Sequence, residues 1–155
     1  MVPPRIVVIG IGNIERGDDG AGRAVARLLR HMLFGGVEIV EQDGEATALL
    51  DKLDGAASAY VIDACMSNAP PGTIHCIDAT HAPLPQASSD LSTHGFGLAA
   101  AIELGRALDR LPARTIVYAV EAESFAAGAP LSEAVAAATV IVADRIRSEI
   151  EEAAA

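Results

Sequence analysis

The chain has 155 residues, a length that predicts one domain over residues 1–155 with a single buried core. Its 21 Asp and Glu residues outnumber its 11 Lys and Arg residues, and the formal net charge is −10 at pH 7. A surface of this charge repels a polyanion, so we expect no nucleic-acid partner. Hydrophobic residues make up 51% of the chain, a content that argues against intrinsic disorder.

Targeting and redox features predict a soluble, cytoplasmic protein with no membrane partner. No run reaches the ~18 consecutive apolar residues that a membrane-spanning helix needs. The start of the sequence also lacks the layout of a secretory signal peptide. The two cysteines, Cys65 and Cys76, are too few for a disulfide framework and fit a reducing compartment.

Strand and helix patterns alternate along the first half of the chain. A β-branched run at 5–9 is apolar without alternation, as expected for a strand buried on both faces. Apolar residues at helical spacing predict a helix from Ala21 to Met32, which Gly35-Gly36 allow to end in a left-handed cap. The next patterns predict a strand at 37–40, a helix at 47–53 and a strand at 59–62 that ends at Asp63.

The second half continues this alternation. The turn signal Pro70-Pro71-Gly72 precedes a predicted strand at 73–77, and a Pro-, Ser- and Ala-rich segment at 81–93 predicts a long loop. The remaining patterns predict a helix at 97–108, a strand at 115–120 and a helix at 131–151. Together they predict a three-layer α/β/α fold with a mostly parallel central sheet of about five strands.

Reactive side chains fall where the predicted strands end. Asp18-Asp19 follow the first strand, Asp63 ends the third strand, and His94 ends the long loop. Ligands of parallel sheets bind outside the carboxyl ends of the strands, so we expect these side chains to converge. Carboxylates beside an imidazole suit a divalent transition metal such as zinc or nickel. Repulsion between Asp19 and Asp63 would favour the uptake of a cation.

The same residues have simpler structural interpretations. Asp18 or Asp19 would cap the helix that follows, Asp63 would form a turn, and His94 would cap the helix that starts near Gly97. Glu121 and Glu123, after the last predicted strand, are expected to line the end of the sheet. Composition and spacing alone leave the metal site and the structural roles open.

Five segments in a fixed order resemble a known family, the hydrogenase maturation proteases, which trim the large subunit of nickel-iron hydrogenases. The segments are Gly10-Ile11-Gly12-Asn13, Gly17-Asp18-Asp19-Gly20-Ala21-Gly22, Ile62-Asp63-Ala64, Pro71-Gly72-Thr73 and Ser92-Thr93-His94-Gly95-Phe96-Gly97-Leu98. With the strands around them, they lie between Arg5 and about residue 120, which is most of the chain. Their order and spacing, rather than any single segment, carry the resemblance.

The resemblance implies an aspartyl-type endopeptidase that removes the C-terminal extension of a nickel-loaded [NiFe]-hydrogenase large-subunit precursor. Position by position, the family's nickel-binding residues fall on Asp19, Asp63 and His94. The resemblance also implies that nickel arrives with the substrate, and that divalent metals such as zinc or cadmium can substitute for it. The whole chain would then be a single domain of this type.

The family also carries an Asp-Gly pair after the second strand, which Asp43-Gly44 match. The resemblance gives Asp43 a catalytic role, for which general-base chemistry is the natural form. Relatives continue with Gly and Thr, whereas this chain has Glu45-Ala46-Thr47. We expect the extra carboxylate to alter the rim of the pocket and with it the hydrogenase that is recognised.

Three alternatives remain beside this interpretation. Gly10-x-Gly12 after a strand suggests nucleotide binding, but the full dinucleotide pattern needs a glycine where this chain has Glu15. Cys65 would serve a cysteine-dependent peptidase or amidase if His94 activated it, although a free cysteine between Ala64 and Met66 is more typical of inert packing. A non-catalytic, nickel-dependent binding module for the same partner would use the same metal site.

Overall fold

The computed structural model describes residues 3–33, 35–84 and 95–154. Strands and helices alternate along it in the order that the sequence predicts. The elements are β1 (Ile6–Ile11), the short 3₁₀ helix η1 (Gly17–Gly20), α1 (Ala21–Met32), β2 (Val37–Gln42), α2 (Ala46–Leu53), β3 (Ser58–Cys65), β4 (Ile74–Asp78), α3 (Gly95–Ala107), β5 (Arg114–Glu121) and α4 (Glu133–Ala154).

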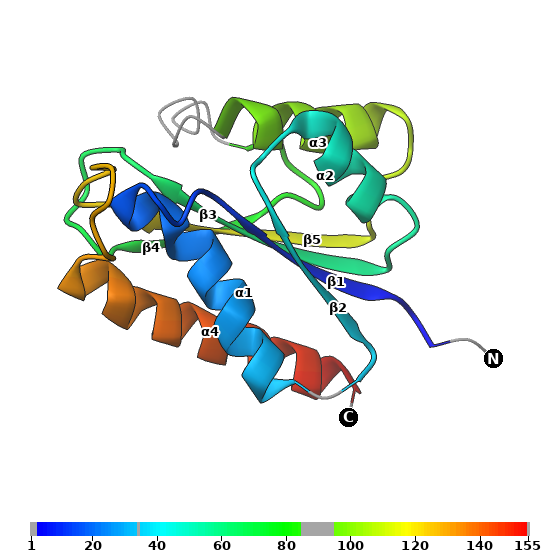
Figure 1. Ribbon diagram of the computed structural model, residues 1–155. Helices are drawn as coiled ribbons and strands as arrows, with labels where there is room; N and C mark the ends of the chain where they lie inside the picture. The colour runs from blue at the N-terminus through cyan, green and yellow to red at the C-terminus, as the bar shows by residue number, and fades with distance from the viewer. Residues whose placement is uncertain (1–2, 34, 85–94, 155) are drawn as a thin grey trace.

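Within the described residues, five strands form one sheet in the order β2-β1-β3-β5-β4. All neighbouring strands are parallel except β4, which pairs antiparallel with β5 at one edge. Helices α1 and α4 cover one face of this sheet, and α2 and α3 cover the other (Figure 1). The predicted α/β fold with a mostly parallel sheet is therefore confirmed.

Each central strand sends alternate side chains into two separate cores. Val8, Tyr60 and Tyr118 pack with α1 and α4, whereas Val61 and Val117 pack with α2 and α3. Because both faces are covered, these strands are continuous apolar runs rather than alternating ones, which is why periodicity identified them. The charged side chains of these central strands, Asp63, Arg114 and Glu121, therefore lie toward the strand ends.

Helix α4 is the longest element of the described chain. Its buried face carries Val135, Val142 and Ile146, which pack against α1 and the sheet, and its other face is exposed. None of the helices in the described ranges is long and apolar enough to cross a lipid bilayer.

Most of the predicted boundaries differ from the structure by one to three residues. Strand β3 continues to Cys65, two residues past Asp63, because its ladder with β5 runs on to the pair Cys65 and Glu121. Helix α3 begins at Gly95 rather than at 97, and α4 runs from Glu133 to Ala154 rather than over 131–151. Of the predicted loop at 81–93, only 81–84 lie within the described residues, and they form neither helix nor strand.

Candidate functional site

The parallel strands β1, β2, β3 and β5 all end at one edge of the sheet. We call this the carboxyl edge and define it by Gly12, Asp43, Cys65 and Glu121, which end or follow these four strands. The short helix η1 follows β1 and packs against β3 at this edge. The carboxylates of Asp18, Asp19, Asp43 and Asp63 all lie on these segments or directly follow them.

Asp19 and Asp63 are buried carboxylates on two segments in contact, η1 and β3. Asp63 is 0% exposed and Asp19 is 1% exposed. The Oδ1 atom of Asp63 accepts a hydrogen bond from the Ala64 N–H at 2.8 Å. Asp63 thus lies within strand β3, near its carboxyl end. It does not form the turn that the simpler interpretation predicted.

Two glycines hold the segment that carries Asp19 close to the strands. A Cβ atom on Gly22 would lie 2.3 Å from the carbonyl oxygens of both Ile11 and Ile62. Gly12 has a φ of +146°, and a Cβ there would lie 1.8 Å from the Asp19 carbonyl oxygen. A side chain at either position would push η1 and α1 away from β1 and β3. Gly12 and Gly22 therefore allow the close backbone packing at this edge.

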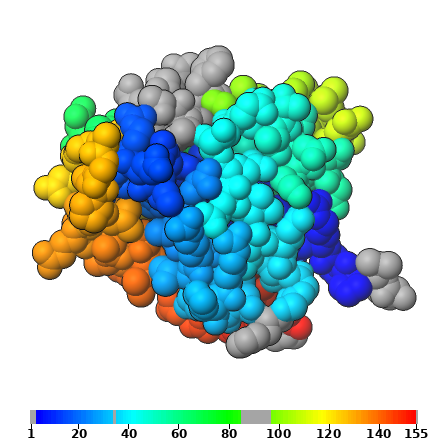
Figure 2. Space-filling model, in the orientation of Figure 1, coloured from blue at the N-terminus to red at the C-terminus, as the bar shows by residue number. Residues whose placement is uncertain are grey.

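Asp18 does not cap the helix that follows it, so that simpler interpretation is wrong for this residue. The first residue of α1 is preceded by Gly20, which makes no side-chain cap. Instead Asp18, 1% exposed, accepts hydrogen bonds from the N–H groups of Glu123, Ser124 and Ser132 at 2.8, 3.2 and 2.7 Å. It also accepts one from the Ser132 hydroxyl at 2.9 Å. Figure 2 shows the resulting contact, where the segment after β5 lies directly against the segment that carries η1.

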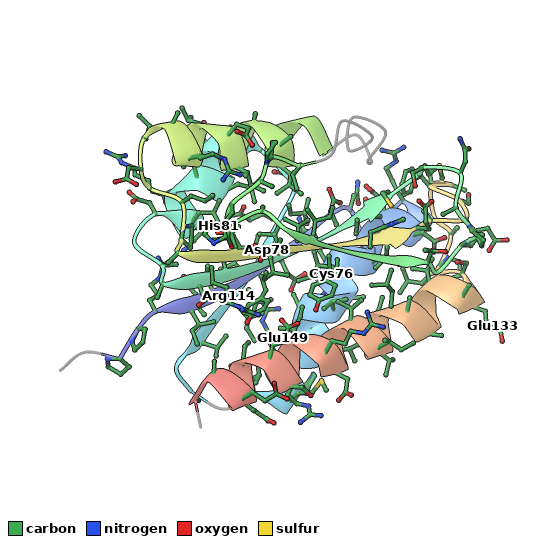
Figure 3. All side chains as sticks on the ribbon, turned by 180° about the vertical axis from the view of Figure 1, so that it is seen from behind. Cys76, Asp78, His81, Arg114, Glu133 and Glu149 are labelled. Carbon is green, nitrogen blue, oxygen red and sulfur yellow. The ribbon has the colours of Figure 1, made fainter. Side chains whose placement is uncertain are left out.

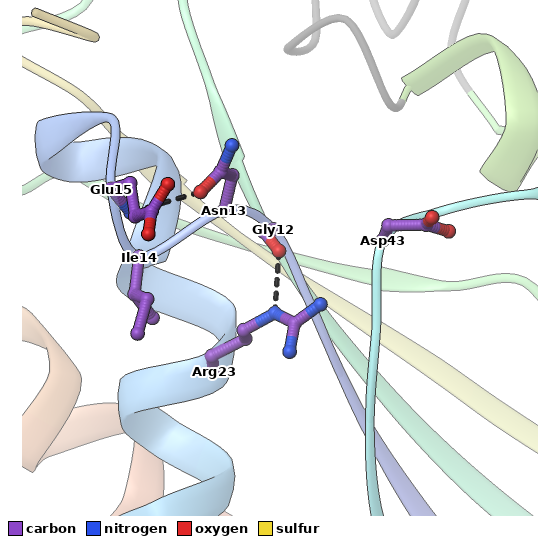
Figure 4. A pocket seen from close by; sticks show the side chains of 6 residues that line it. All are labelled: Gly12, Asn13, Ile14, Glu15, Arg23 and Asp43. Carbon is purple, nitrogen blue, oxygen red and sulfur yellow. Dashed lines mark hydrogen bonds between the residues drawn. The ribbon is translucent and has the colours of Figure 1, made fainter. Parts of the chain in front are cut away.

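Asp43 follows β2 and is exposed at the carboxyl edge. It borders a cavity of about 330 Å³ together with Gly12, Asn13, Ile14, Glu15 and Arg23. Arg23 reaches from α1 toward the Gly12 carbonyl, to which its Nε donates at 2.5 Å, whereas the Asp43 side chain points away from Arg23 (Figure 4). The carboxylate of Asp43 is therefore exposed beside this cavity.

Glu45, where the chain departs from the family's pattern, has a local structural role. Its two carboxylate oxygens accept hydrogen bonds from the N–H groups of Thr47 and Ala48, at 2.9 and 3.0 Å, at the start of α2. These backbone hydrogen bonds lower the pKa of Glu45. The extra carboxylate thus caps a helix.

His94 lies outside the described residues. The helix that follows it, α3, starts at Gly95, and a Cβ on Gly97 would lie 2.1 Å from the Gly44 carbonyl oxygen. The first turn of α3 is therefore packed against the Asp43-Gly44 segment of the carboxyl edge. The structure brings together the segments of Asp19, Asp63 and Asp43 at one end of the sheet.

A further cluster at this edge was not found by sequence reasoning. Glu121, 1% exposed, lies with its Oε1 atom 3.4 Å from the Cys65 Sγ and 3.1 Å from the His75 Nε2. Ser67 donates its N–H and its hydroxyl to the same carboxylate. The one signal in the sequence was that Cys65 and Glu121 both follow apolar strands; nothing local connected them to His75.

Burial and hydrogen bonding act in opposite directions on this cluster. Burial raises the pKa of Glu121, but hydrogen bonds from Ser67, His75 and Cys65 outweigh burial and leave the pKa below its ordinary value. The Cys65 thiol, 1% exposed, has a strongly raised pKa, first because it is buried and then because Glu121 is beside it. A thiol that resists ionisation is a poor nucleophile, which argues against the cysteine-dependent peptidase.

Comparisons with known proteins connect this fold to a family. Residues 23–149 match the model of the family described as hydrogenase maturation protease. The hydrogenase expression/formation protein HupD of Rhodobacter capsulatus is 30% identical over 139 residues, which cover 86% of this chain and 65% of that protein. HupD of Thiocapsa roseopersicina is 29% identical over 120 residues, which cover 76% of this chain and 54% of that protein. The chain thus spans between half and two thirds of the length of these curated relatives.

Solved structures share the fold. The hydrogenase maturating endopeptidase HybD from E. coli superposes with a TM-score of 0.82 at 24% identity, covering 96% of this chain and 93% of that one. The maturation protease HybD from Thermococcus kodakarensis gives a TM-score of 0.71 at 22% identity, covering 93% and 97%. Because the family match extends over most of the sequence and agrees with its motifs, the chain belongs to the hydrogenase maturation protease family.

Proposed function

We propose that the chain is an endopeptidase that removes the C-terminal extension from the nickel-loaded precursor of a [NiFe]-hydrogenase large subunit. One observation carries this proposal: a chain of this family buries two carboxylates, Asp63 on β3 and Asp19 on η1, at the edge where parallel sheets bind ligands. The proposal requires both carboxylates to reach one metal ion, and this is supported by the contact between the segments η1 and β3 that carry them.

In this proposal nickel belongs to the substrate. Asp19, Asp63 and, from outside the described residues, His94 would bind the ion that the precursor carries. Two carboxylates and an imidazole are a donor set suited to divalent nickel, and zinc or cadmium would substitute for it. Carboxylates removed from water interact more strongly with a divalent cation than exposed ones do, which favours recognition of a loaded precursor over an empty one.

Asp43 is the residue that we assign to proton transfer in peptide cleavage. It is exposed, follows β2 and borders the cavity beside Gly12 and Arg23, so a peptide docked at the carboxyl edge can reach it. Simultaneous contact of the precursor with the three proposed nickel ligands would hold the scissile peptide near this carboxylate. Positioning of this kind contributes several kcal/mol to lowering a reaction barrier.

The test is a processing assay with purified components. The chain is mixed with the nickel-loaded precursor of a candidate large subunit, and intact mass spectrometry measures the length of the product. We expect loss of a C-terminal segment with the wild type, and no cleavage of the same precursor prepared without nickel. Asp63→Asn, which removes a charge and keeps the shape of the side chain, should abolish cleavage.

The matched control is Asp51→Asn, which makes the same change at an exposed position of α2 and should cleave like the wild type. Circular dichroism verifies that both variants fold. Full activity of a folded Asp63→Asn variant contradicts the assignment of Asp63. Tight binding of the precursor by the wild type without any change in mass supports the non-catalytic binding module instead.

A further inference from the structure

A second set of metal-ligating side chains lies on the carboxyl edge, and none of its members belongs to the proposed nickel set. Cys65 ends β3, His75 is on β4, and Glu121 ends β5. One ligand atom from each residue lies within 4.8 Å of the other two. The three residues come from adjacent strands in the sheet order β3-β5-β4.

Strand register explains why these side chains meet. Cys65 is paired with Glu121, and His75 is paired with Ala119 on the same strand as Glu121. Because side chains alternate along a strand, all three lie on the face covered by α2 and α3. Cys76, one residue after His75, is paired with Tyr118 and therefore lies on the opposite face, toward α4 (Figure 3).

We propose that Cys65, His75 and Glu121 form a binding site for a resident divalent cation of the zinc type. A thiolate, an imidazole and a carboxylate are the three ligand classes that zinc uses in proteins. Ligands placed about 2.0–2.3 Å from a tetrahedral zinc are roughly 3.3–3.7 Å from one another. The observed separations from Glu121 Oε1, 3.4 Å to sulfur and 3.1 Å to nitrogen, are close to this range.

The crowding at Glu121 supports a cation at this position. A single oxygen, Oε1, is contacted by the Cys65 thiol, the His75 ring and the Ser67 hydroxyl, and it also shares the Ser67 N–H with Oε2, at 3.2 and 3.1 Å. One carboxylate oxygen offers about two lone-pair positions, so it cannot accept from all of these groups at once. With a cation among the three ligands, Cys65 and His75 offer lone pairs to the metal, and Ser67 keeps its hydrogen bonds to the carboxylate.

Charge and access are both compatible with this site. Binding of M²⁺ releases the Cys65 thiol proton to solvent, so the thiolate and Glu121 together balance the charge of the ion. The His75 side chain is 36% exposed, which provides a route for the ion, whereas Glu121 is 1% exposed. A bound ion would connect the ends of β3 and β5 to the edge strand β4.

Cobalt(II) is the probe that tests the site. The purified chain is treated with a chelator, dialysed and titrated with Co²⁺ while its absorption spectrum is recorded. Cobalt bound to a thiolate gives a sulfur-to-metal charge-transfer band in the near ultraviolet, and the oxygen and nitrogen ligands of the proposed nickel set cannot produce it. We expect one equivalent of Co²⁺ to give this band and excess Zn²⁺ to remove it.

Four variants make the test specific. Cys65→Ser should abolish the band, and Cys76→Ser, a cysteine one residue from His75 on the opposite face, should keep it. His75→Gln, at a partly exposed position where folding is easily retained, should weaken Co²⁺ binding by at least the ~10- to 100-fold that follows loss of an outer partner of a metal ligand. Asp63→Asn should keep the band, which separates this site from the proposed function.

Three results would overturn the proposal. They are the absence of a sulfur charge-transfer band in the wild type at saturating Co²⁺, a band that survives in folded Cys65→Ser, and a band that requires Cys76 or Asp63. If Cys65→Ser fails to fold, zinc K-edge X-ray absorption of the wild type decides the question. A zinc–sulfur distance near 2.3 Å supports the site, and a shell of oxygen and nitrogen alone refutes it.

Discussion

Asp18 and Ser132 are 114 positions apart in the chain, yet Asp18 Oδ1 accepts the Ser132 N–H at 2.7 Å and its Oδ2 accepts the Ser132 hydroxyl at 2.9 Å. This buried pair attaches η1, which carries Asp19, to the residue that precedes α4. The position of Asp19, a proposed nickel ligand on η1, therefore depends on a contact between segments that are far apart in the chain.

Asp18→Asn should lower the free energy of unfolding by about 3 kcal/mol, as expected when a buried charged acceptor loses its partners. The carboxylate oxygens accept from Ser132 on one side and from Glu123 and Ser124 on the other. Either orientation of the amide therefore places an NH₂ group against a backbone N–H. Urea denaturation measures the change, with the exposed Asp51→Asn as the control. A loss below about 0.5 kcal/mol would contradict this role of Asp18.

Gly22→Ala should destabilise the protein by about 3 kcal/mol, because the added Cβ would overlap two strand carbonyls and the backbone must move apart. Gly105→Ala is the matched control in another helix. Its Cβ would meet the Leu50 and Leu111 side chains at 3.3 and 3.5 Å, and alanine favours the helix by about 1 kcal/mol. Thermal unfolding should separate the two variants clearly. Equal melting temperatures would show that the close approach at Gly22 is not required.

The two cysteines should differ in reactivity. Cys76 is exposed, whereas Cys65 is buried and its thiol pKa is raised by burial and by Glu121. A raised pKa leaves less thiolate at neutral pH, and the thiolate is the species that reacts. With chelator present, iodoacetamide should add one label to the native chain, at Cys76, and a second label only in denaturant. Peptide mass mapping checks the positions, and rapid native labelling of Cys65 would refute this assignment.

Glu41 should contribute stability that disappears in acid. Burial raises its pKa, but hydrogen bonds from Arg30 and Arg27 and their charges outweigh burial, so the pKa lies below its ordinary value. A depressed folded pKa means that the contribution is complete above the ordinary value near pH ~4.3 and is lost as pH falls through the folded value. Glu41→Gln should therefore cost about 1 kcal/mol at pH 7 and progressively less below pH ~4.

Urea denaturation at several pH values measures the Glu41 effect. Glu152→Gln, at an exposed position of α4, is the control for loss of a negative charge. A difference between Glu41→Gln and the wild type that stays constant down to pH ~3 would contradict the ion-pair explanation.

Asp43→Asn should lower the rate of precursor cleavage by about 10²- to 10⁴-fold, the usual contribution of a general base. Its affinity for the precursor should remain close to that of the wild type, because Asp43 is outside the proposed nickel set. Single-turnover processing gives the rate, and a pull-down with the loaded precursor gives the binding. A cleavage rate equal to that of Asp51→Asn would remove Asp43 from the mechanism.

Much of the fold was predictable because its signals are local. Helix α1 spans Ala21–Met32 as predicted, since its apolar spacing marks its length, but Leu33 ends it in an extended conformation and not in the left-handed cap expected from Gly35-Gly36. Strand β3 was predicted two residues short, because polar Asp63 resembles a strand end until the ladder with β5 is known. Asp18 was interpreted as a helix cap for a similar reason. It directly precedes a helix in the sequence, but its hydrogen-bond partners come from a backbone segment more than 100 residues away.

The sequence by itself determined the order of strands and helices, the two-sided burial of the sheet and the family, because periodicity and motif spacing are properties of short segments. Only the tertiary structure decided which polar side chains meet. The cluster of Cys65, His75 and Glu121 exists because β5 lies between β3 and β4 and because β4 runs antiparallel. Strand order and direction depend on how whole layers pack, and no local pattern of residues encodes them.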